Sequence, residues 1–497
     1  MDSPASNPQS SFFTSVLKLV SGTTLAQLIT VLTAPIITRL FAPEMFGVQN
    51  VFTSLVTIIS VVICLRYEFA IVLPEDDEDA ANLVGVCVLI AVGISIFASI
   101  FLVMLGRPLV NLLHAPNLYG FLWLIPIALL IQGFFQAMNY WNTRTKHFGR
   151  LSIARVSASS TTSALPIFIG LLGKATSGGL VFSYVAGTFV YMCVLGYQVL
   201  KESGAFFYRF IQRARMLANL KRYRKFPLID SWGSFINNLS WQLPNLMLLY
   251  FFSETVVGYY SLSNRLILLP LTLLGNSIAQ VLYQRSAELR SNPDNLSRSV
   301  QAIFHRLVAI GLFPAIILAV AGPELFTIVF GANWTEAGRY AQILSPWMFV
   351  LFISTPLGNL FATLERQELS LTINSIILLT RFASLAIGGL MHNIFLTLVI
   401  WSVSGVLVYG GLAFWLLYLT RVSLRTAFRS ILQFLLYASF PALGLLAILK
   451  LLTPSTLWVI ILTIVSVAAY YSLVLARDHG LREYLVALLP NSLKRVG

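Results

Sequence analysis

The sequence predicts an all-α polytopic membrane protein of about fourteen transmembrane helices, with two six-helix lobes and two further C-terminal helices. Its 497 residues are 57% hydrophobic and only 10% charged, whereas a soluble protein carries about 25% charged residues. Apolar runs of about 20 residues, the length that crosses a bilayer, recur along the chain. Basic residues collect in alternate connections between these runs, as the positive-inside rule describes.

The apolar runs define the expected spans in chain order. Six precede a strongly basic segment at 201–226 and eight follow it. We expect the spans at 14–39, 47–65, 80–105, 119–140, 151–172, 179–200, 227–251, 257–283, 301–320, 337–363, 369–390, 392–418, 431–452 and 454–475.

The distribution of basic residues predicts that both termini are cytoplasmic. With that orientation, the segment 201–226 lies inside and carries eight basic residues, while the outer loops keep little beyond Arg107 and Lys174. The acidic run at 75–79 would also lie inside. Because acidic residues count for little in the orientation rule, this run does not reverse the assignment.

A faint internal repeat predicts the domain organisation. Phe41 and Gly47 recur 211 residues later as Phe252 and Gly258. A second set recurs at an offset of 220 residues, with Pro126, Asn139, Thr143 and Lys146 matching Pro346, Asn359, Thr363 and Arg366. We therefore expect an N-terminal lobe at 1–200, a cytoplasmic linker at 201–226, a C-terminal lobe at 227–420, and added helices with a tail at 421–497. Two such halves with a site between them are a common transporter plan.

Several function classes are disfavoured by the same residues. The net charge of +14 is spread over the loops, so it indicates membrane orientation rather than nucleic acid. Cys64, Cys87 and Cys193 lie in apolar runs without the spacing of a metal site or a disulfide framework. The histidines are scattered, and no glycine-rich phosphate loop is present. We expect no enzyme activity, no cofactor and no metal.

Charge within the spans is the strongest functional signal. Lys18, Arg39, Arg155, Arg265 and Arg381 lie in or at the ends of expected spans, and each costs roughly 2.5–3.5 kcal/mol at a helix centre. Matching carboxylates are scarce, which indicates a hydrated cationic cavity that suits an anion. We expect Arg155, Arg265 and Arg381 to line it, whereas Lys18 and Arg39 are close enough to span ends to reach the interface.

Polar residues at helical spacing give the other candidate substrate contacts. They follow one face of four spans and include Gln136, Asn139, Asn238, Gln242, Asn245, Asn276 and Gln280. Amides and hydroxyls are what a sugar-rich ligand needs. The alternative is that they form hydrogen bonds between helices, which use the same residue types.

Four motifs resemble those of the Wzx-type oligosaccharide flippases, in the multidrug/oligosaccharidyl-lipid/polysaccharide exporter superfamily. They are Pro35 to Gly47, Arg66 to Pro74, Gly258 to Leu262, and Phe330 to Gly338. The resemblance covers roughly residues 10–480. It implies a two-lobed fold like that of multidrug and toxin extruders, in the bacterial inner membrane. Arg39, Arg66 and Glu68 fall in these motifs near helix ends, where a gate or a structural role is expected.

The resemblance also implies the cargo: an undecaprenyl-pyrophosphate-linked oligosaccharide for O-antigen, capsule or exopolysaccharide, with buried basic residues meeting the pyrophosphate. Its expected partners are this lipid-linked oligosaccharide, membrane lipids, and a polysaccharide polymerase with other assembly proteins. A sibling exporter of peptidoglycan precursors or drugs is the alternative. A membrane polymerase or glycosyltransferase is less favoured, because the longest expected outer loop, 321–336, has only about 16 residues. Proton or sodium coupling stays open, and no buried carboxylate stands out in the sequence as a carrier.

Overall fold

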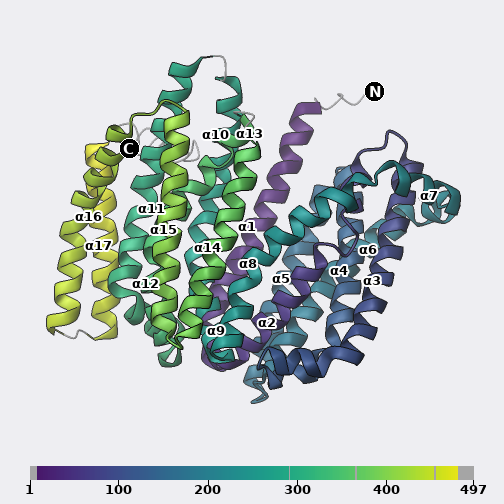
Figure 1. Ribbon diagram of the computed structural model, residues 1–497, viewed down its shortest axis with the longest axis horizontal. Coiled ribbons are helices and arrows are strands. Elements are labelled where there is room, and N and C mark those ends of the chain that lie inside the picture. The colour runs from purple at the N-terminus through teal and green to yellow at the C-terminus, as the bar shows by residue number, and fades with distance from the viewer. Residues whose placement is uncertain (1–7, 290–291, 364–366, 453–454, 479–497) are drawn as a thin grey trace, which may run out of the picture. The chain divides into compact units, whose positions relative to one another are not determined.

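The chain is built from helices joined by short connections (Figure 1). The structure is a computed structural model that describes residues 8–289, 292–363, 367–452 and 455–478, and it contains no strand in these ranges. The helices divide into two compact units, Met1–Ser261 and Leu262–Gly497. The predicted all-α fold class is therefore confirmed.

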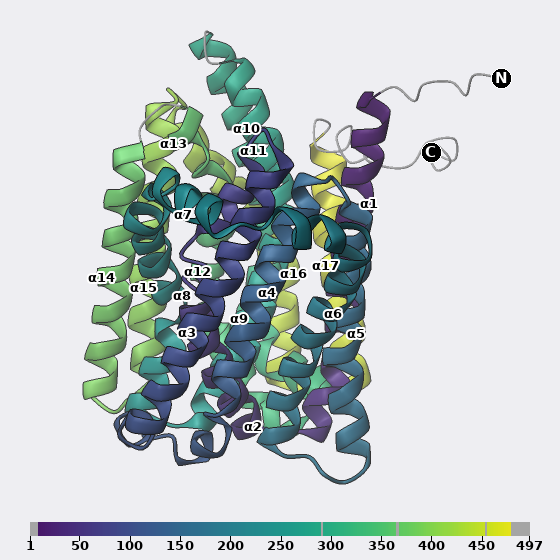
Figure 2. The same ribbon diagram turned by 90° about the vertical axis from the view of Figure 1, so that its right-hand side faces the viewer.

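The first unit packs its helices mainly against neighbours that are close in the chain. In both views α1 lies beside α5 (Figures 1 and 2), and α3 packs on α4 while α5 packs on α6. The helices are α1 (Pro8–Leu40), α2 (Pro43–Ser60), α3 (Asp77–Leu112), α4 (Leu124–Arg144), α5 (Phe148–Leu171), α6 (Ser177–Phe210), α7 (Arg213–Arg222), α8 (Ser231–Phe251) and the start of α9 (Glu254–Pro270).

The second unit begins within α9 and continues through a π-helical turn, η4 (Leu271–Gly275). Its long helices α11 and α12 form the most extensive pair, with α15 on α12 and α16 on α11. The remaining helices are α10 (Asn276–Glu288), α11 (Pro293–Phe330), α12 (Thr335–Leu357), α13 (Leu360–Thr363), α14 (Gln367–Leu390), α15 (Ile394–Leu419), α16 (Leu424–Leu452) and α17 (Thr456–Arg477).

Membrane-spanning character is clear for most of these helices. In the part of the chain that the structure describes, nine helices are long and apolar enough to cross a membrane, so this is a multi-pass membrane protein. Helices with more polar residues, such as α5 with its serines and Arg155, fall outside that group. Every predicted span overlaps a helical segment, but the count of fourteen stays a prediction.

The domain boundaries also stay a prediction. The two compact units are defined by contacts between residues and not by the sequence repeat. Helix α8, expected in the C-terminal lobe, packs on α2 and belongs to the first unit. Arg366, one member of the predicted repeat, lies outside the described residues.

Two acidic residues of the run at 75–79, which fitted the orientation rule poorly, form ion pairs with basic neighbours. The Arg144 guanidinium at the end of α4 forms an ion pair of 2.9 Å with Asp77. It also donates hydrogen bonds to the carbonyl oxygens of Pro74, at 2.7 Å, and Glu75, at 3.1 Å. Charge-assisted bonds of this kind are about twice as strong as neutral ones, so they hold the connection that leads into α3.

The same acidic run holds α7, the helix within the basic linker. Arg215 of α7 pairs with Glu78, and the Asn219 amide donates to the Asp79 backbone carbonyl at 3.2 Å. The acidic run and the basic linker are thus complementary parts of one surface in the first unit.

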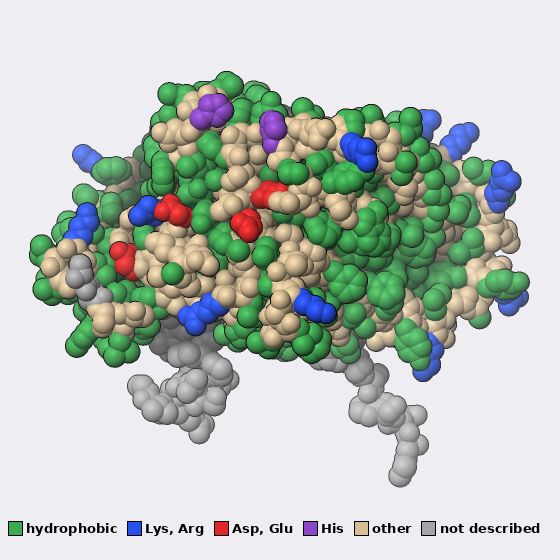
Figure 3. All heavy atoms as spheres, turned by 90° about the horizontal axis from the view of Figure 1, so that it is seen from below, with side chains coloured by type: hydrophobic (Ala, Val, Ile, Leu, Met, Phe, Trp, Pro, Cys, Tyr) green, Lys and Arg blue, Asp and Glu red, His purple; other side chains and the backbone are tan. Residues whose placement is uncertain are grey.

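Figure 3 views the helices from below the view of Figure 1, and in it Lys and Arg side chains stand apart from one another among hydrophobic side chains and a few Asp and Glu side chains. The predicted orientation requires few basic residues on the outer side, and this end is the expected outer side.

In α11 of the second unit, prolines leave two backbone carbonyls without a helical donor, and side chains of other helices donate to them instead. Pro323 has no N–H to donate to the Ala319 carbonyl one turn earlier in α11. The Gln342 amide of α12 donates to that oxygen instead, at 2.6 Å. The backbone between them bends at Ala321, whose φ of −121° and ψ of 17° are not helical.

Pro314 creates a similar vacancy that helps to dock α17. It leaves the Ile310 carbonyl of α11 without its helical donor, and the Tyr471 hydroxyl of α17 donates to this oxygen at 2.9 Å. The neighbouring Tyr470 hydroxyl donates to the Ala309 carbonyl, also at 2.9 Å. Two adjacent tyrosines therefore fix α17 on α11.

Candidate functional site

The candidate site of the first unit begins at an unusual turn between α2 and α3. After α2 ends at Ser60, the backbone of Leu65 and Arg66 adopts positive φ values of 49° and 65°. Residues with a Cβ rarely adopt this left-handed conformation, because it costs about 1–2 kcal/mol each. The short helix η1 (Tyr67–Val72) follows, and the turn aims Arg66 and Glu68 at the start of α8.

Arg66 is the centre of a charged cluster at this turn. Its Nε donates to Asp230 Oδ2 at 2.8 Å, and its Nη1 lies 3.8 Å from Glu68 Oε1. The guanidinium also lies 4.1 Å above the centre of the Phe69 ring. Because the Asp230 side chain is 48% exposed, this ion pair contributes only about 0–1 kcal/mol to stability.

Glu68 is the most constrained acid of the cluster. Its side chain is 2% exposed, and within the described residues its Oε2 has no hydrogen-bond partner. Burial raises the pKa of Glu68 to about 7, although the nearby Arg66 opposes this change. Glu68 lies in the connection between α2 and α3, and it is the buried carboxylate that did not stand out in the sequence.

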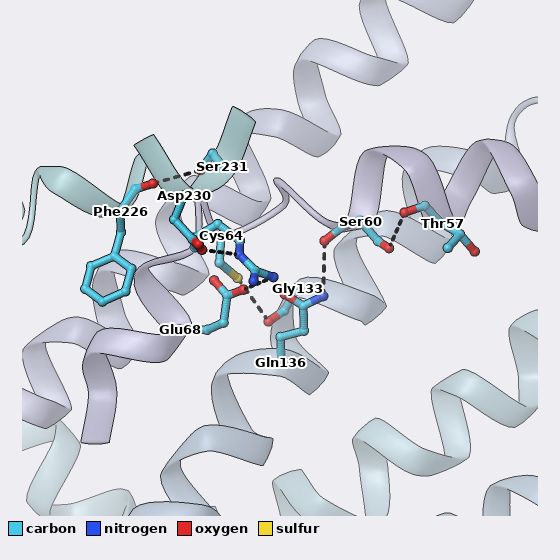
Figure 4. Close-up of polar contacts among 10 residues, drawn as sticks. Thr57, Ser60, Cys64, Glu68, Gly133, Gln136, Phe226, Asp230 and Ser231 are labelled. Carbon is cyan, nitrogen blue, oxygen red and sulfur yellow. Dashed lines mark hydrogen bonds and ion pairs between the residues drawn. The ribbon is translucent and has the colours of Figure 1, made fainter. Parts of the chain in front are cut away.

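Asp230 reaches the cluster because the chain enters α8 through a π-helical turn, η3 (Phe226–Asp230). Figure 4 shows Asp230 and Glu68 pointing toward the same place, with the Ser231 hydroxyl bonded to the Phe226 carbonyl at 3.3 Å. In the sequence, Asp230 lies near the start of the expected span 227–251. Asp230 pairs with Arg66, which lies 164 positions earlier, so no sequence pattern near Asp230 indicates this contact.

Gln136 of α4, which was predicted to contact the substrate, lies beside this cluster (Figure 4). Its side chain is packed against neighbouring residues. Its amide Nε2 donates to the Ser60 carbonyl at 3.1 Å, while its Oε1 is enclosed without a partner among the described residues. The Cys64 thiol donates to the Gly133 carbonyl at 3.6 Å (Figure 4). Asn139, one turn further along α4, is half-buried. The enclosed Gln136 oxygen and Glu68 Oε2 are the unsatisfied acceptors of this region.

The polar face of α8 is used largely for packing on α2. The Ser54 hydroxyl donates to Gln242 Oε1 at 3.0 Å and accepts from Asn245 Nδ2 at 2.9 Å. Ser261 of α9 donates to Asn245 Oδ1 at 3.4 Å. These contacts match the alternative of interhelical hydrogen bonding. Asn238 differs, because its Oδ1 is enclosed and unpartnered in the part of the chain that the structure describes.

Arg155 of α5 faces α1. It donates a hydrogen bond to the Thr23 hydroxyl, and the Ser159 hydroxyl donates to the Ala26 carbonyl at 2.6 Å. Arg39 is exposed at the end of α1, and the side chain of Lys18 lies outside the described residues. Arg155 is thus a half-buried basic residue within an expected span.

Arg381 of α14 is enclosed by aromatic rings in the second unit. It is 6% exposed, and its Nη2 donates to the Tyr409 hydroxyl at 2.8 Å. The guanidinium lies 5.7 Å from the Trp401 ring centre and 6.0 Å from that of Tyr409, within the range of cation–π attraction. A small pocket beside it is also lined by Trp347 and Ser404.

Among the residues that the structure describes, Arg265 and Gln280 do not line the pocket beside Arg381. Arg265 is exposed on α9 and Gln280 is exposed on α10, while the side chain of Asn276 lies outside the described residues. The Arg265 side chain is therefore accessible from the surface of α9, whereas the Arg381 guanidinium is enclosed by aromatic rings.

Comparison with known proteins gives the chain a family. A profile of the family described as "polysaccharide biosynthesis protein" matches residues 36–339. The chain is 22% identical over 326 residues to the succinoglycan biosynthesis transport protein ExoT of Rhizobium meliloti, covering 63% of this chain and 61% of that protein. It is 20% identical over 286 residues to an uncharacterized membrane protein in the cps region of Klebsiella pneumoniae, covering 56% and 58%. The matches thus span about three fifths of these relatives' length.

Solved structures share the fold. The lipid II flippase MurJ in an inward closed conformation has a TM-score of 0.69 at 10% identity, covering 93% of this chain and 99% of that one. An inward-facing multidrug resistance MATE family transporter has a TM-score of 0.64 at 15% identity, covering 82% and 98%. These relatives are named as transporters and a flippase, in agreement with the prediction that the chain is not an enzyme. The chain belongs to the polysaccharide biosynthesis protein family and has the fold of the multidrug/oligosaccharidyl-lipid/polysaccharide exporter superfamily.

Proposed function

We propose that this protein is a flippase that moves an undecaprenyl-pyrophosphate-linked oligosaccharide from the cytoplasmic to the periplasmic leaflet. Its family and its transporter fold support the export of a polysaccharide precursor. The observation that carries an anionic cargo is the placement of Arg265, an exposed cation on a helix of a membrane protein. Arg265 lies in the expected span 257–283, and a cation within a span is costly unless water or an anion meets it.

The cargo explains why a polar route is needed. Each hydroxyl costs about 4–8 kcal/mol in hydrocarbon without a partner, so an oligosaccharide does not cross a bilayer unaided. An exposed amide on an expected span, such as that of Gln280, offers hydrogen-bond partners to sugar hydroxyls. The lipid tail can stay in the bilayer while the head group moves.

The membrane potential favours outward movement of this cargo. A pyrophosphate diester carries about two negative charges, and each charge is worth about 2.3 kcal/mol per 100 mV. An inside-negative potential therefore assists export without a coupled ion. We place the protein in the bacterial inner membrane with both termini in the cytoplasm, on the basic residues of 201–226.

The second candidate is a sibling exporter of peptidoglycan precursors or drugs. The specific observation in its favour is the fold, which resembles a lipid II flippase and a multidrug transporter alike. The cargo of this chain is therefore distinguished by the deletion phenotype. Loss of surface polysaccharide without lysis indicates the proposed flippase, lysis indicates a peptidoglycan exporter, and drug sensitivity indicates a multidrug exporter.

The decisive experiment deletes the gene in its host and determines which leaflet accumulates the lipid-linked repeat unit. We expect accumulation on the cytoplasmic leaflet together with loss of surface polymer. Unpolymerised units on the periplasmic leaflet would overturn the proposal, because transport would then proceed without this protein. A polymerase would be the function indicated by that result.

A further inference from the structure

Helix α7, in the basic linker at 201–226, has an exposed face that takes part in none of the contacts described above. Arg213, Leu217 and Lys221 are exposed and follow each other at intervals of four residues, which places them on one helical face. The other side of α7 carries Arg215 and Asn219, which contact the acidic run at 75–79. The exposed face of α7 therefore points away from the acidic run.

Contacts with α3 fix the level of α7 along the membrane-spanning helices. Helix α3 is long and apolar enough to cross a membrane, and its expected span begins at residue 80. The Asn219 amide donates to the Asp79 carbonyl at 3.2 Å. Deeper along α3, the Met216 methyl group of α7 would lie 3.2 Å from a Cβ at Gly85. Because Asp79 and Gly85 lie on either side of that boundary, α7 lies where α3 enters the bilayer.

The junction between α6 and α7 is tied to α3 as well. The buried Asn82 side chain donates from Nδ2 to the Phe210 carbonyl at 2.9 Å and accepts at Oδ1 from the Gln212 N–H at 2.8 Å. Figure 1 shows α7 at the outer edge of the first unit, beside α3 and α6. A helix at the edge of the bundle and at this level has lipid head groups beside it.

Exposed side chains of the linker combine cations with apolar groups. Within the described residues, no acidic side chain forms an ion pair with Arg213, Lys221, Arg224 or Lys225. Leu217 is 57% exposed and Tyr208 is 95% exposed. This mixture is typical of helices that lie in the membrane interface, and each Lys or Arg near an anionic leaflet favours association about fivefold.

We propose that α7 and the basic linker bind the anionic phospholipid surface beside them. Leu217 inserts among the head groups, and Arg213 and Lys221 bind their phosphates. A lipid surface fits this face better than an acidic protein does, because the face lies at the level of the head groups and carries an exposed leucine between its two cations. This inference goes beyond the proposed function and does not depend on the cargo.

The test places a fluorophore on the exposed face of the full-length protein. It is attached to Leu217→Cys in a Cys193→Ser background, since Cys64 and Cys87 are buried. The protein is reconstituted in nanodiscs of phosphatidylcholine, with or without phosphatidylglycerol, that contain a lipid with a spin label at its head group. We expect the spin label to quench the fluorophore more strongly in the nanodiscs with phosphatidylglycerol.

Charge variants show whether the linker cations cause this increase. Combining Arg213→Gln, Lys221→Gln and Arg224→Gln should abolish it, because three contributions of about fivefold each are lost. In about 1 M salt, where the Debye length is about 3 Å, the increase should also disappear. The matched control removes three exposed charges outside the linker and should keep the increase: Arg421→Gln, Arg425→Gln and Arg429→Gln.

Three results would overturn the proposal. Equal quenching in the two kinds of nanodisc would mean that the face does not bind anionic lipid and is open to an acidic protein partner. Wild-type quenching in the linker variant would show that its cations do not hold the lipid. Loss of the increase in the control variant would show an effect of net charge alone. Should Leu217→Cys not fold, Ala218→Cys at the neighbouring exposed position carries the fluorophore, and the same results decide.

Discussion

Gly47 of α2 and Gly258 of α9 pack against each other's helix starts in a reciprocal contact. A Cβ at Gly47 would lie 1.8 Å from the Glu254 carbonyl oxygen, and a Cβ at Gly258 would lie 1.9 Å from the Pro43 carbonyl oxygen. Both pairs are related by the repeat offset of 211 residues. The two repeated motifs therefore meet at backbone contact distance, where only glycine fits.

The first prediction is that Gly47→Ala lowers stability because its methyl group collides with a backbone carbonyl that cannot rotate away. Forcing extra atoms into a packed contact costs about 1–3 kcal/mol. The purified protein should therefore show a lower Tm. Gly93→Ala in α3 is the matched control, since nothing lies within 4 Å of a Cβ there. A Tm for Gly47→Ala at or above that of Gly93→Ala would contradict this packing.

Glu68 gives a prediction about pH. Because burial raises its pKa from 4.5 to about 7, the folded protein binds this proton more tightly than the unfolded chain does. The stability that Glu68 contributes is therefore fully present below about pH 4.5 and is lost as pH rises through about 7. At about 1.4 kcal/mol for each unit of pKa, the loss is on the order of 3 kcal/mol.

The measurement compares Glu68→Gln with wild type across this pH range. The amide resembles the protonated carboxyl, so the two proteins should melt alike near pH 5, and the variant should be the more stable near pH 8. A constant difference between wild type and Glu68→Gln at all pH values would refute the buried, protonatable state of Glu68.

Alanine substitutions at Arg265 and Arg381 should differ in their effect on the stability of the protein. We expect Arg265→Ala to leave Tm nearly unchanged, because exposed positions usually shift stability by less than about 0.5 kcal/mol. Arg381→Ala should lower stability by about 1–3 kcal/mol, since the buried Tyr409 hydroxyl loses its partner. Tyr409→Phe removes the same bond while keeping the cation and provides the comparison.

Under the proposed function, both alanine variants should slow flipping of the lipid-linked oligosaccharide while expression holds. The expected loss is about tenfold or more for an interaction with a charged group. Reconstituted vesicles and a leaflet-specific probe measure the rate. Full activity in both variants would remove the support for a cationic route.

Tyr471 should matter for the docking of α17. Tyr471→Phe leaves the Ile310 carbonyl without a donor, because Pro314 already supplies none, and this costs about 1–3 kcal/mol. We expect a lower Tm and faster proteolysis at the connection before α17. Tyr418→Phe, at a side chain that is 69% exposed, should behave as wild type. Equal protease resistance in the two variants would show that this hydrogen bond does not hold α17.

The sequence by itself determined the membrane class, the helical fold and the family motifs. Long apolar runs leave a helix as the simplest way to satisfy backbone hydrogen bonds in lipid, so composition and run length predict the fold class. The recurrence of Gly47 at Gly258 predicted a repeat, and the structure shows that each glycine lies against the other helix, where a Cβ would not fit.

Only the tertiary structure decided which polar residues find partners. Gln242 and Asn245 share a helical stripe with Asn238, but Ser54 of α2 satisfies the first two, while Asn238 keeps an enclosed acceptor. Arg381 and Arg265 both lie in expected spans, yet aromatic rings enclose one and the other is exposed. Helical spacing fixes the face on which a side chain lies, whereas its burial and its pKa depend on elements distant in sequence, as Glu68 shows beside Asp230.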